Sequence, residues 1–247
     1  MAVKQSPKQS AKKLDISLHL RQAMDVHRQN RFVEAERAYR AILDLAPDCF
    51  AALHFLGLAC LQQNKLPEAL DSVSRALKAK PQSTDSLAMR GIVLSNLGRY
   101  AEALESHNAL LALQPKSAET HYNRGVALAK LGRHEEAVAS YKSSISLKPG
   151  NPQVFHNLGN SLVELGRPQE ALEAYDGTLA GAKTETLVNR GNVLLELKRL
   201  DEALESYDRA LACERDHIDA LIGRGHALCS LERNDDALIS YNRALEL

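Results

Sequence analysis

Asparagines recur at a fixed interval in the later part of the sequence, and they are the side chains best suited to bind a ligand. Asn123, Asn157 and Asn189 are separated by 34 and 32 residues, and Asn160 and Asn192 follow two of them three positions later. Residues three apart share one face of a helix, and an amide both donates and accepts hydrogen bonds. A row of such amides is therefore able to hold the backbone of an extended peptide.

Tyr122 and His156 directly precede two of these asparagines, and we include both among the candidate peptide contacts. The alternative interpretation is that asparagine is only tolerated on a solvated helix face. Unrelated side chains occupy the equivalent positions in the rest of the sequence: Arg21, Phe55, Met89 and Gly223.

No pattern in the sequence predicts catalysis, a cofactor or a bound metal. The phosphate-binding motif GxxxxGK[ST] and the zinc motif HExxH are absent. The four cysteines have no CxxC spacing, and the histidines are scattered. The acidic pairs Glu135-Glu136 and Asp235-Asp236 open predicted helices, where negative charge favours the helix dipole. We expect no catalytic residues, no cofactor and no metal site, and hence no enzyme within these residues.

Composition and charge exclude further classes of partner. The 247 residues are 45% hydrophobic and 25% charged, and 31 basic side chains balance 31 acidic ones. Nucleic-acid binding requires an excess of Lys and Arg, and a membrane span requires an apolar run of about 18 residues or more; we therefore expect neither partner. Without a signal-peptide pattern, a cytoplasmic location is expected. The lysine-rich residues 1–14 are predicted to form a disordered tail.

The rest of the sequence, residues 15–247, is one repeated unit. An early glycine recurs at intervals of 34, 34, 34, 32 and 34 residues: Gly57, Gly91, Gly125, Gly159, Gly191 and Gly225. An alanine follows each of them by twelve residues, and in four cases a tyrosine follows by sixteen. The resulting repeats span about 16–49, 50–83, 84–117, 118–151, 152–183, 184–217 and 218–247, the last one incomplete.

Each repeat is predicted to form two helices joined by a short turn. Apolar residues recur at helical spacing on both sides of Gly132, which ends the first helix of its repeat. The early glycine and the following alanine are small because the paired helices approach closely there. Arginines occupy the position before four early glycines, and we interpret them as packing between helices while reaching an acidic neighbour.

These features resemble the tetratricopeptide repeat family. The resemblance rests on the period of 34 residues, on Leu56-Gly57 and Leu158-Gly159, and on Ala137, Tyr141 and Pro149. It implies an all-α, right-handed superhelical solenoid of about seven helix-turn-helix repeats, whose concave groove binds extended peptides. The partial row of asparagines resembles the asparagine ladder of O-GlcNAc transferases.

The predicted function is therefore a non-catalytic scaffold that binds a protein or peptide partner in the concave groove. Two alternatives stay open. The repeats could be the substrate-recognition region of a larger O-GlcNAc transferase-like enzyme with a catalytic domain beyond Leu247. Alternatively, the array could self-associate through its C-terminal end, where Leu238, Ile239, Leu245 and Leu247 are expected to be exposed.

The fifth repeat is two residues shorter than the others and carries Gly177 near its end. We predict a shortened, looser second helix there, and we favour a tolerated deletion over a hinge.

Overall fold

The computed structural model of the protein describes residues 7–177 and 182–247, with side chains described from Asp15 onward. The described residues form fourteen α-helices and contain no strand, which confirms the predicted all-α repeat fold. The helices are α1 (Pro7–Arg28), α2 (Phe32–Leu45), α3 (Phe50–Gln62), α4 (Leu66–Ala79), α5 (Thr84–Asn96), α6 (Tyr100–Leu113), α7 (Ala118–Lys130), α8 (His134–Leu147), α9 (Pro152–Glu164), α10 (Pro168–Asp176), α11 (Thr184–Glu196), α12 (Leu200–Cys213), α13 (Ile218–Ser230) and α14 (Asn234–Leu245).

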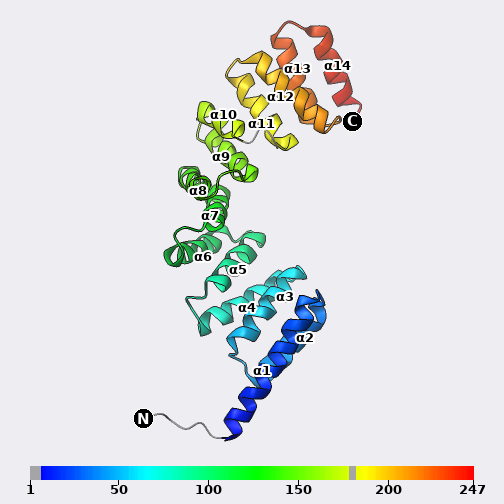
Figure 1. The fold of residues 1–247 in the computed structure, drawn as a ribbon. Helices are drawn as coiled ribbons and strands as arrows, with labels where there is room; N and C mark the ends of the chain where they lie inside the picture. Colours follow the sequence, from blue (N-terminus) through cyan, green and yellow to red (C-terminus); the bar gives the residue numbers. More distant parts are fainter. Residues whose placement is uncertain (1–6, 178–181) are drawn as a thin grey trace. The chain divides into compact units, whose positions relative to one another are not determined.

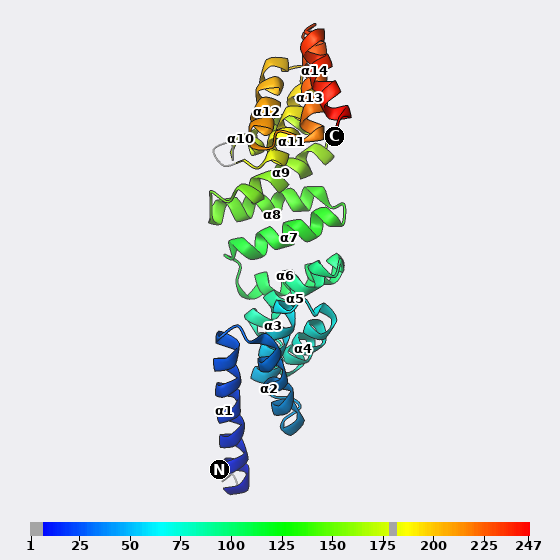
Figure 2. The ribbon, with the colours of Figure 1, turned by 90° about the vertical axis from the view of Figure 1, so that its right-hand side faces the viewer.

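Successive helices pair within each predicted repeat, as α7 and α8 show clearly where they lie side by side (Figures 1 and 2). Contacts divide the array into two compact halves, which we call the N-terminal half (up to Lys116) and the C-terminal half (Ser117–Leu247). All candidate groove asparagines belong to the C-terminal half.

Helix α1 begins at Pro7, inside the stretch that we predicted to be a disordered tail. The prediction therefore needs correction for residues 7–14, whereas residues 1–6 lie outside the described part of the chain. Proline is well tolerated in the first turn of a helix, and residues 8–14 contain neither glycine nor a second proline. The backbone can consequently continue upstream of the first repeat as one helix.

Left-handed residues end the first helix of most repeats. Gly98, Gly132 and Gly166 have φ of 73°, 72° and 65°, which confirms the predicted role of Gly132 as a helix stop and extends it to the other two. In the last two repeats the same position holds Lys198 and Glu232, both with φ of 60°. A side chain at such φ is strained, whereas glycine is not. These two turns therefore keep the left-handed geometry at a cost in strain.

The early glycine of each repeat in the C-terminal half lies directly against a tyrosine of the second helix. A Cβ atom at Gly125 would lie 2.5 Å from Cε1 of Tyr141, and one at Gly159 would lie 2.3 Å from Cε1 of Tyr175. Both tyrosines are almost fully buried. The predicted small-residue contact is therefore a contact between glycine and an aromatic ring, which positions the tyrosine hydroxyl close to the first helix.

The second helix of the fifth repeat is shortened, as predicted. Helix α10 has 9 residues, whereas α8 and α12 each have 14. Gly177 follows this helix as its C-cap and does not lie within it; a Cβ atom there would be 2.8 Å from the Phe155 ring. Residues 178–181 lie outside the described part of the chain, so the predicted looseness and the hinge stay untested predictions.

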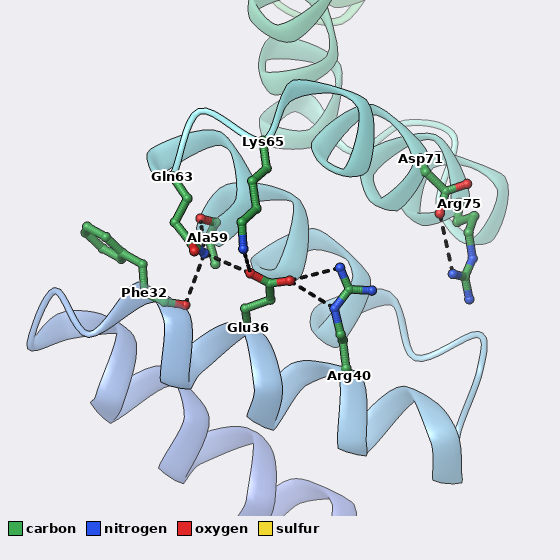
Figure 3. A network of polar contacts seen from close by, with 8 residues as sticks. All are labelled: Phe32, Glu36, Arg40, Ala59, Gln63, Lys65, Asp71 and Arg75. Carbon is green, nitrogen blue, oxygen red and sulfur yellow. Dashed lines mark hydrogen bonds and ion pairs between the residues drawn. The ribbon is translucent and has the colours of Figure 1, made fainter.

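A partly buried polar network joins α2 to the turn between α3 and α4 in the N-terminal half (Figure 3). The Glu36 carboxylate accepts hydrogen bonds from Lys65 Nζ at 2.7 Å, from Gln63 Nε2 at 3.0 Å and from Arg40 Nη2 at 2.9 Å. Burial alone would raise the pKa of Glu36, but the bonds from Lys65, Arg40 and Gln63 together lower the pKa below its ordinary value. Glu36 is thus held as an anion at an otherwise apolar helix contact.

Candidate peptide-binding groove

The candidate asparagines lie on α7, α9 and α11, the first helices of three successive repeats. On α9, Asn157 and Asn160 are separated by one turn, and Asn189 and Asn192 repeat this spacing on α11. Asn160, Asn189 and Asn192 line one open hollow of about 370 Å³. A neighbouring hollow of about 250 Å³ includes Asn157 and Asn160. Because Asn160 belongs to both, the hollows form a continuous surface within the C-terminal half.

Asn160 is the centre of a hydrogen-bond network that spans α9, α10 and α11. Its Oδ1 accepts the Tyr175 hydroxyl at 2.7 Å and the Asn189 Nδ2 group at 3.0 Å. Its Nδ2 group lies 3.0 Å from His156 Nε2. The network ties the candidate peptide contacts to each other, so the orientation of these amides is fixed before any ligand arrives.

Asn192 repeats part of this arrangement in the next repeat. Its Oδ1 accepts the Tyr207 hydroxyl at 2.7 Å. Tyr207 is fully buried, and burial raises the pKa of its hydroxyl. Asn160 and Asn192 therefore have a structural role that the sequence argument missed, because each one satisfies a buried tyrosine hydroxyl fifteen residues later in its own repeat.

The predicted contacts Tyr122 and Asn157 lie together across two repeats. Asn157 Nδ2 donates to the Tyr122 hydroxyl at 3.3 Å, and Asn157 Oδ1 accepts from Gln153 Nε2 at 3.2 Å. Burial raises the pKa of Tyr122, and the bond from Asn157 partly offsets that effect. Asn123 is half-buried and makes no side-chain hydrogen bond to the described residues. Four of the five asparagines thus have side-chain hydrogen bonds, in three separate groups, and Asn123 has none with the described residues.

His156 is held as a neutral imidazole. Its Nδ1 atom lies 2.8 Å from Thr186 Oγ1, while Nε2 faces the Asn160 amide group. Since the amide N–H donates, Nε2 must accept and Nδ1–H donates to the threonine. Burial lowers the pKa of His156, partly offset by the nearby Glu185 carboxylate. His156 therefore orients Asn160 and joins α9 to α11.

Hydrogen-bond capacity stays available on this surface. Among the described residues, no partner is present for Asn189 Oδ1 or for Asn192 Nδ2. One acceptor and one donor on neighbouring turns of α11 match the alternating C=O and N–H groups of an extended peptide backbone.

Two of the four arginines before the early glycines reach an acidic neighbour, as predicted. Arg190 donates to Asp176 Oδ1 at 2.7 Å, and Arg224 donates to Asp208 Oδ1 at 2.6 Å. Each of them also contacts a serine of its own repeat, Ser206 or Ser240. These guanidinium groups are engaged between helices and are not offered to a ligand.

An aromatic cluster in the N-terminal half was not predicted. The Tyr39 and Phe55 rings stack with centroids 6.0 Å apart, and His27 lies 5.9 Å from Tyr39 and 6.4 Å from Phe55. These three residues line a hollow of about 270 Å³. The signal was present in the sequence, because Phe55 occupies the repeat position that holds Asn157 and Asn189 further along.

Other predictions concern the apolar surface of α14, membrane-spanning helices and metal sites. Leu238, Ile239 and Leu245 are 58%, 66% and 85% exposed, so the predicted apolar surface on α14 is present. None of the helices in the described part of the chain has the length and apolar character required to cross a bilayer. Within the described ranges, no group of three or more His, Cys, Asp or Glu side chains is arranged to hold a metal ion.

Comparison with known proteins places this architecture in a family. The tetratricopeptide repeat profile matches residues 20–84, 88–152, 156–218 and 188–247. The chain therefore belongs to the tetratricopeptide repeat family, whose members generally act as non-catalytic scaffolds for protein interactions. No curated protein matches the chain in sequence.

Solved structures with the same fold are numerous, and three illustrate the range. A tetratricopeptide repeat protein from Parabacteroides merdae is 18% identical with a TM-score of 0.69, covering 94% of this chain and 92% of that one. PilF of Pseudomonas aeruginosa is 15% identical with a TM-score of 0.67, covering 85% and 96%. YrrB, described as having an unusual peptide-binding site, is 22% identical with a TM-score of 0.64, covering 72% and 92%. At these identities the likeness shows the fold alone.

Proposed function

We propose that the protein is an interaction scaffold whose C-terminal half binds an extended segment of a partner protein along α7, α9 and α11. The observation that carries this proposal is the row of pre-oriented amides, in which Asn189 and Asn192 keep an acceptor and a donor without a partner among the described residues. The peptide-binding site named for YrrB is a precedent for the class of ligand in this fold.

The ligand in this proposal is recognised mainly through its backbone. Amides that bond peptide N–H and C=O groups do not select side chains, so the ligand must present unpaired backbone groups and be extended or disordered. A folded, compact partner would offer few such groups. The scaffold would therefore bind tails, linkers or unfolded segments.

Binding of unstructured peptides tests this function. Random dodecapeptides displayed on phage are selected on the full chain, and the affinity of a selected synthetic peptide is then measured by calorimetry. Asn157→Ala combined with Asn189→Ala should weaken binding about 30-fold, since each of the two lost pairs of backbone bonds costs on the order of 1 kcal/mol. Asn234→Ala with Asn242→Ala, two exposed asparagines of α14, is the matched control and should leave the affinity unchanged. Equal affinity for both double variants would place the peptide elsewhere.

A further inference from the structure

The hollow between α9 and α11 carries negative charge as well as amides. Its lining consists of three asparagines, two valines, one tyrosine and two carboxylates, Glu164 and Glu196. No Lys, Arg or His is among these lining residues. The neighbouring hollow differs, because Lys130 and His134 line it together with Glu164. The negative charge is thus concentrated at one position of the groove.

The two carboxylates lie on the same helix face as the amides. Asn157, Asn160 and Glu164 follow each other at i, i+3 and i+7 on α9, and Asn189, Asn192 and Glu196 do the same on α11. Such spacing forms a single stripe along a helix. A peptide lying across the asparagines would therefore pass both carboxylates.

Glu164 and Glu196 are exposed, and neither forms an ion pair with the described residues. This separates them from glutamates of the second helices such as Glu170 and Glu202, which pair with Arg167 and Arg199. Both carboxylates line the same hollow, so a cationic side chain bound there would be attracted by each of them.

We propose that this hollow selects a Lys or Arg side chain of the bound segment, so that the ligand of the scaffold is an extended basic peptide. This inference rests on the proposed function and adds selectivity to it. The amides hold the backbone, and Glu164 and Glu196 fix which residues of the ligand face α9 and α11. The arrangement also gives the peptide a preferred register, because Lys130 takes the place of the carboxylate on α7 and disfavours a basic side chain there.

The phage selection described above, repeated on charge variants of the full chain, tests the inference. The wild-type protein should enrich Lys and Arg in the selected dodecapeptides, whereas Glu164→Gln with Glu196→Gln should not. Glu173→Gln with Glu205→Gln removes two exposed carboxylates from the second helices and should keep the enrichment. For a selected peptide, replacing its basic residues by Gln should weaken binding about three- to tenfold to the wild type, as expected for exposed ion pairs.

The outcomes separate the inference from the proposed function. Selected peptides that lack basic enrichment but lose affinity in the Asn157→Ala, Asn189→Ala variant would overturn the charge selectivity and leave backbone recognition standing. A failure to select any peptide would overturn both. Because both glutamates are exposed, circular dichroism of the Gln variants should match that of the wild type.

Discussion

The two halves of the chain use one repeat architecture but place different side chains at equivalent positions of the repeat. The repeat position that holds Asn157 and Asn189 in the C-terminal half holds Phe55 in the N-terminal half, where it stacks on Tyr39. The position packed against the early glycine also differs: it is Tyr175 in the fifth repeat but Val73 and His107 in the second and third. In the C-terminal half the Tyr175 and Tyr207 hydroxyls are buried and need a polar partner, which Asn160 and Asn192 supply one turn after Asn157 and Asn189.

The largest expected effect concerns His107, which takes the place of a tyrosine in the third repeat. The imidazole is 1% exposed, neither ring nitrogen has a hydrogen-bond partner among the described residues, and burial lowers its pKa to about 4. The unfolded chain therefore binds a proton more readily, so the stability conferred by neutral His107 is complete above pH 6.5 and is lost as the pH falls. From a pKa of 6.5 in the unfolded chain, the loss at pH 4 amounts to about 3 kcal/mol.

Urea unfolding at pH 7 and pH 4 measures this loss, and His107→Tyr is the matched variant. Tyrosine fits the equivalent position of the repeats that follow, so this variant should lose about 3 kcal/mol less than the wild type over the same pH interval. Identical pH dependence of the two proteins would show that His107 is not forced to stay neutral.

The next largest expected effect is a difference between the two halves in how much stability an early glycine loses when it is replaced by alanine. Gly159→Ala places a Cβ atom 2.3 Å from the Tyr175 ring and should destabilise the protein by about 1–3 kcal/mol. At Gly57 the nearest atom is the flexible Met89 sulfur at 3.3 Å, so Gly57→Ala should cost little or even stabilise by up to about 1 kcal/mol through helix propensity. Thermal unfolding of both variants measures the contrast, which would be refuted by equal shifts of the melting temperature.

The coupling between tyrosine and asparagine predicts an intermediate effect. Asn160→Ala leaves the buried Tyr175 hydroxyl without its acceptor and should lower the free energy of unfolding by about 1–2 kcal/mol. Asn123→Ala removes no hydrogen bond and should stay within about 0.5 kcal/mol of the wild type. Chemical denaturation measures the stability of both variants. Equal stability would contradict the structural role of the bond between Asn160 and Tyr175.

The smallest expected effect lies in the turns between paired helices. The N-terminal half uses Asn30, Asn64 and Gly98 at positive φ, whereas the last two repeats of the C-terminal half place Lys198 and Glu232 there. Lys198→Gly should stabilise by about 0.5–1 kcal/mol, because relief of left-handed strain exceeds the entropy that glycine adds to the unfolded chain. Lys183→Gly, just before α11 at a φ of −73°, is the control and should give no gain.

The fold could be predicted from the sequence because the period of the small residues indicates where helices pack against each other. The recurring glycines and alanines mark the places where helices meet, and Gly132 marks where a helix ends. Hydrogen bonds between side chains are less visible in a sequence. The contact between Asn160 and Tyr175 joins residues fifteen positions apart on different helices, so the period alone indicated neither the structural role of Asn160 nor the function of His156.

The repeat spacing predicted that the candidate asparagines share one surface. It did not indicate that this surface also carries negative charge. The asparagines are distinctive in the sequence because they recur at the repeat period. Nothing in the sequence distinguishes Glu164 and Glu196 from the many other glutamates. Only the arrangement of α9 and α11 shows that these two face one hollow without a cation among its lining residues. The aromatic cluster around Phe55 was not predicted either, because stacking depends on ring orientations that the sequence does not give.

The most direct measurement of the central claim is an NMR titration of the asparagine side-chain amides with a selected dodecapeptide. We expect the amide resonances of Asn157, Asn189 and Asn192 to shift in a saturable manner, while those of Asn234 and Asn242 stay unchanged. Shifts confined to the N-terminal half, around Phe55 and Tyr39, would contradict the claim that the C-terminal half holds the peptide backbone.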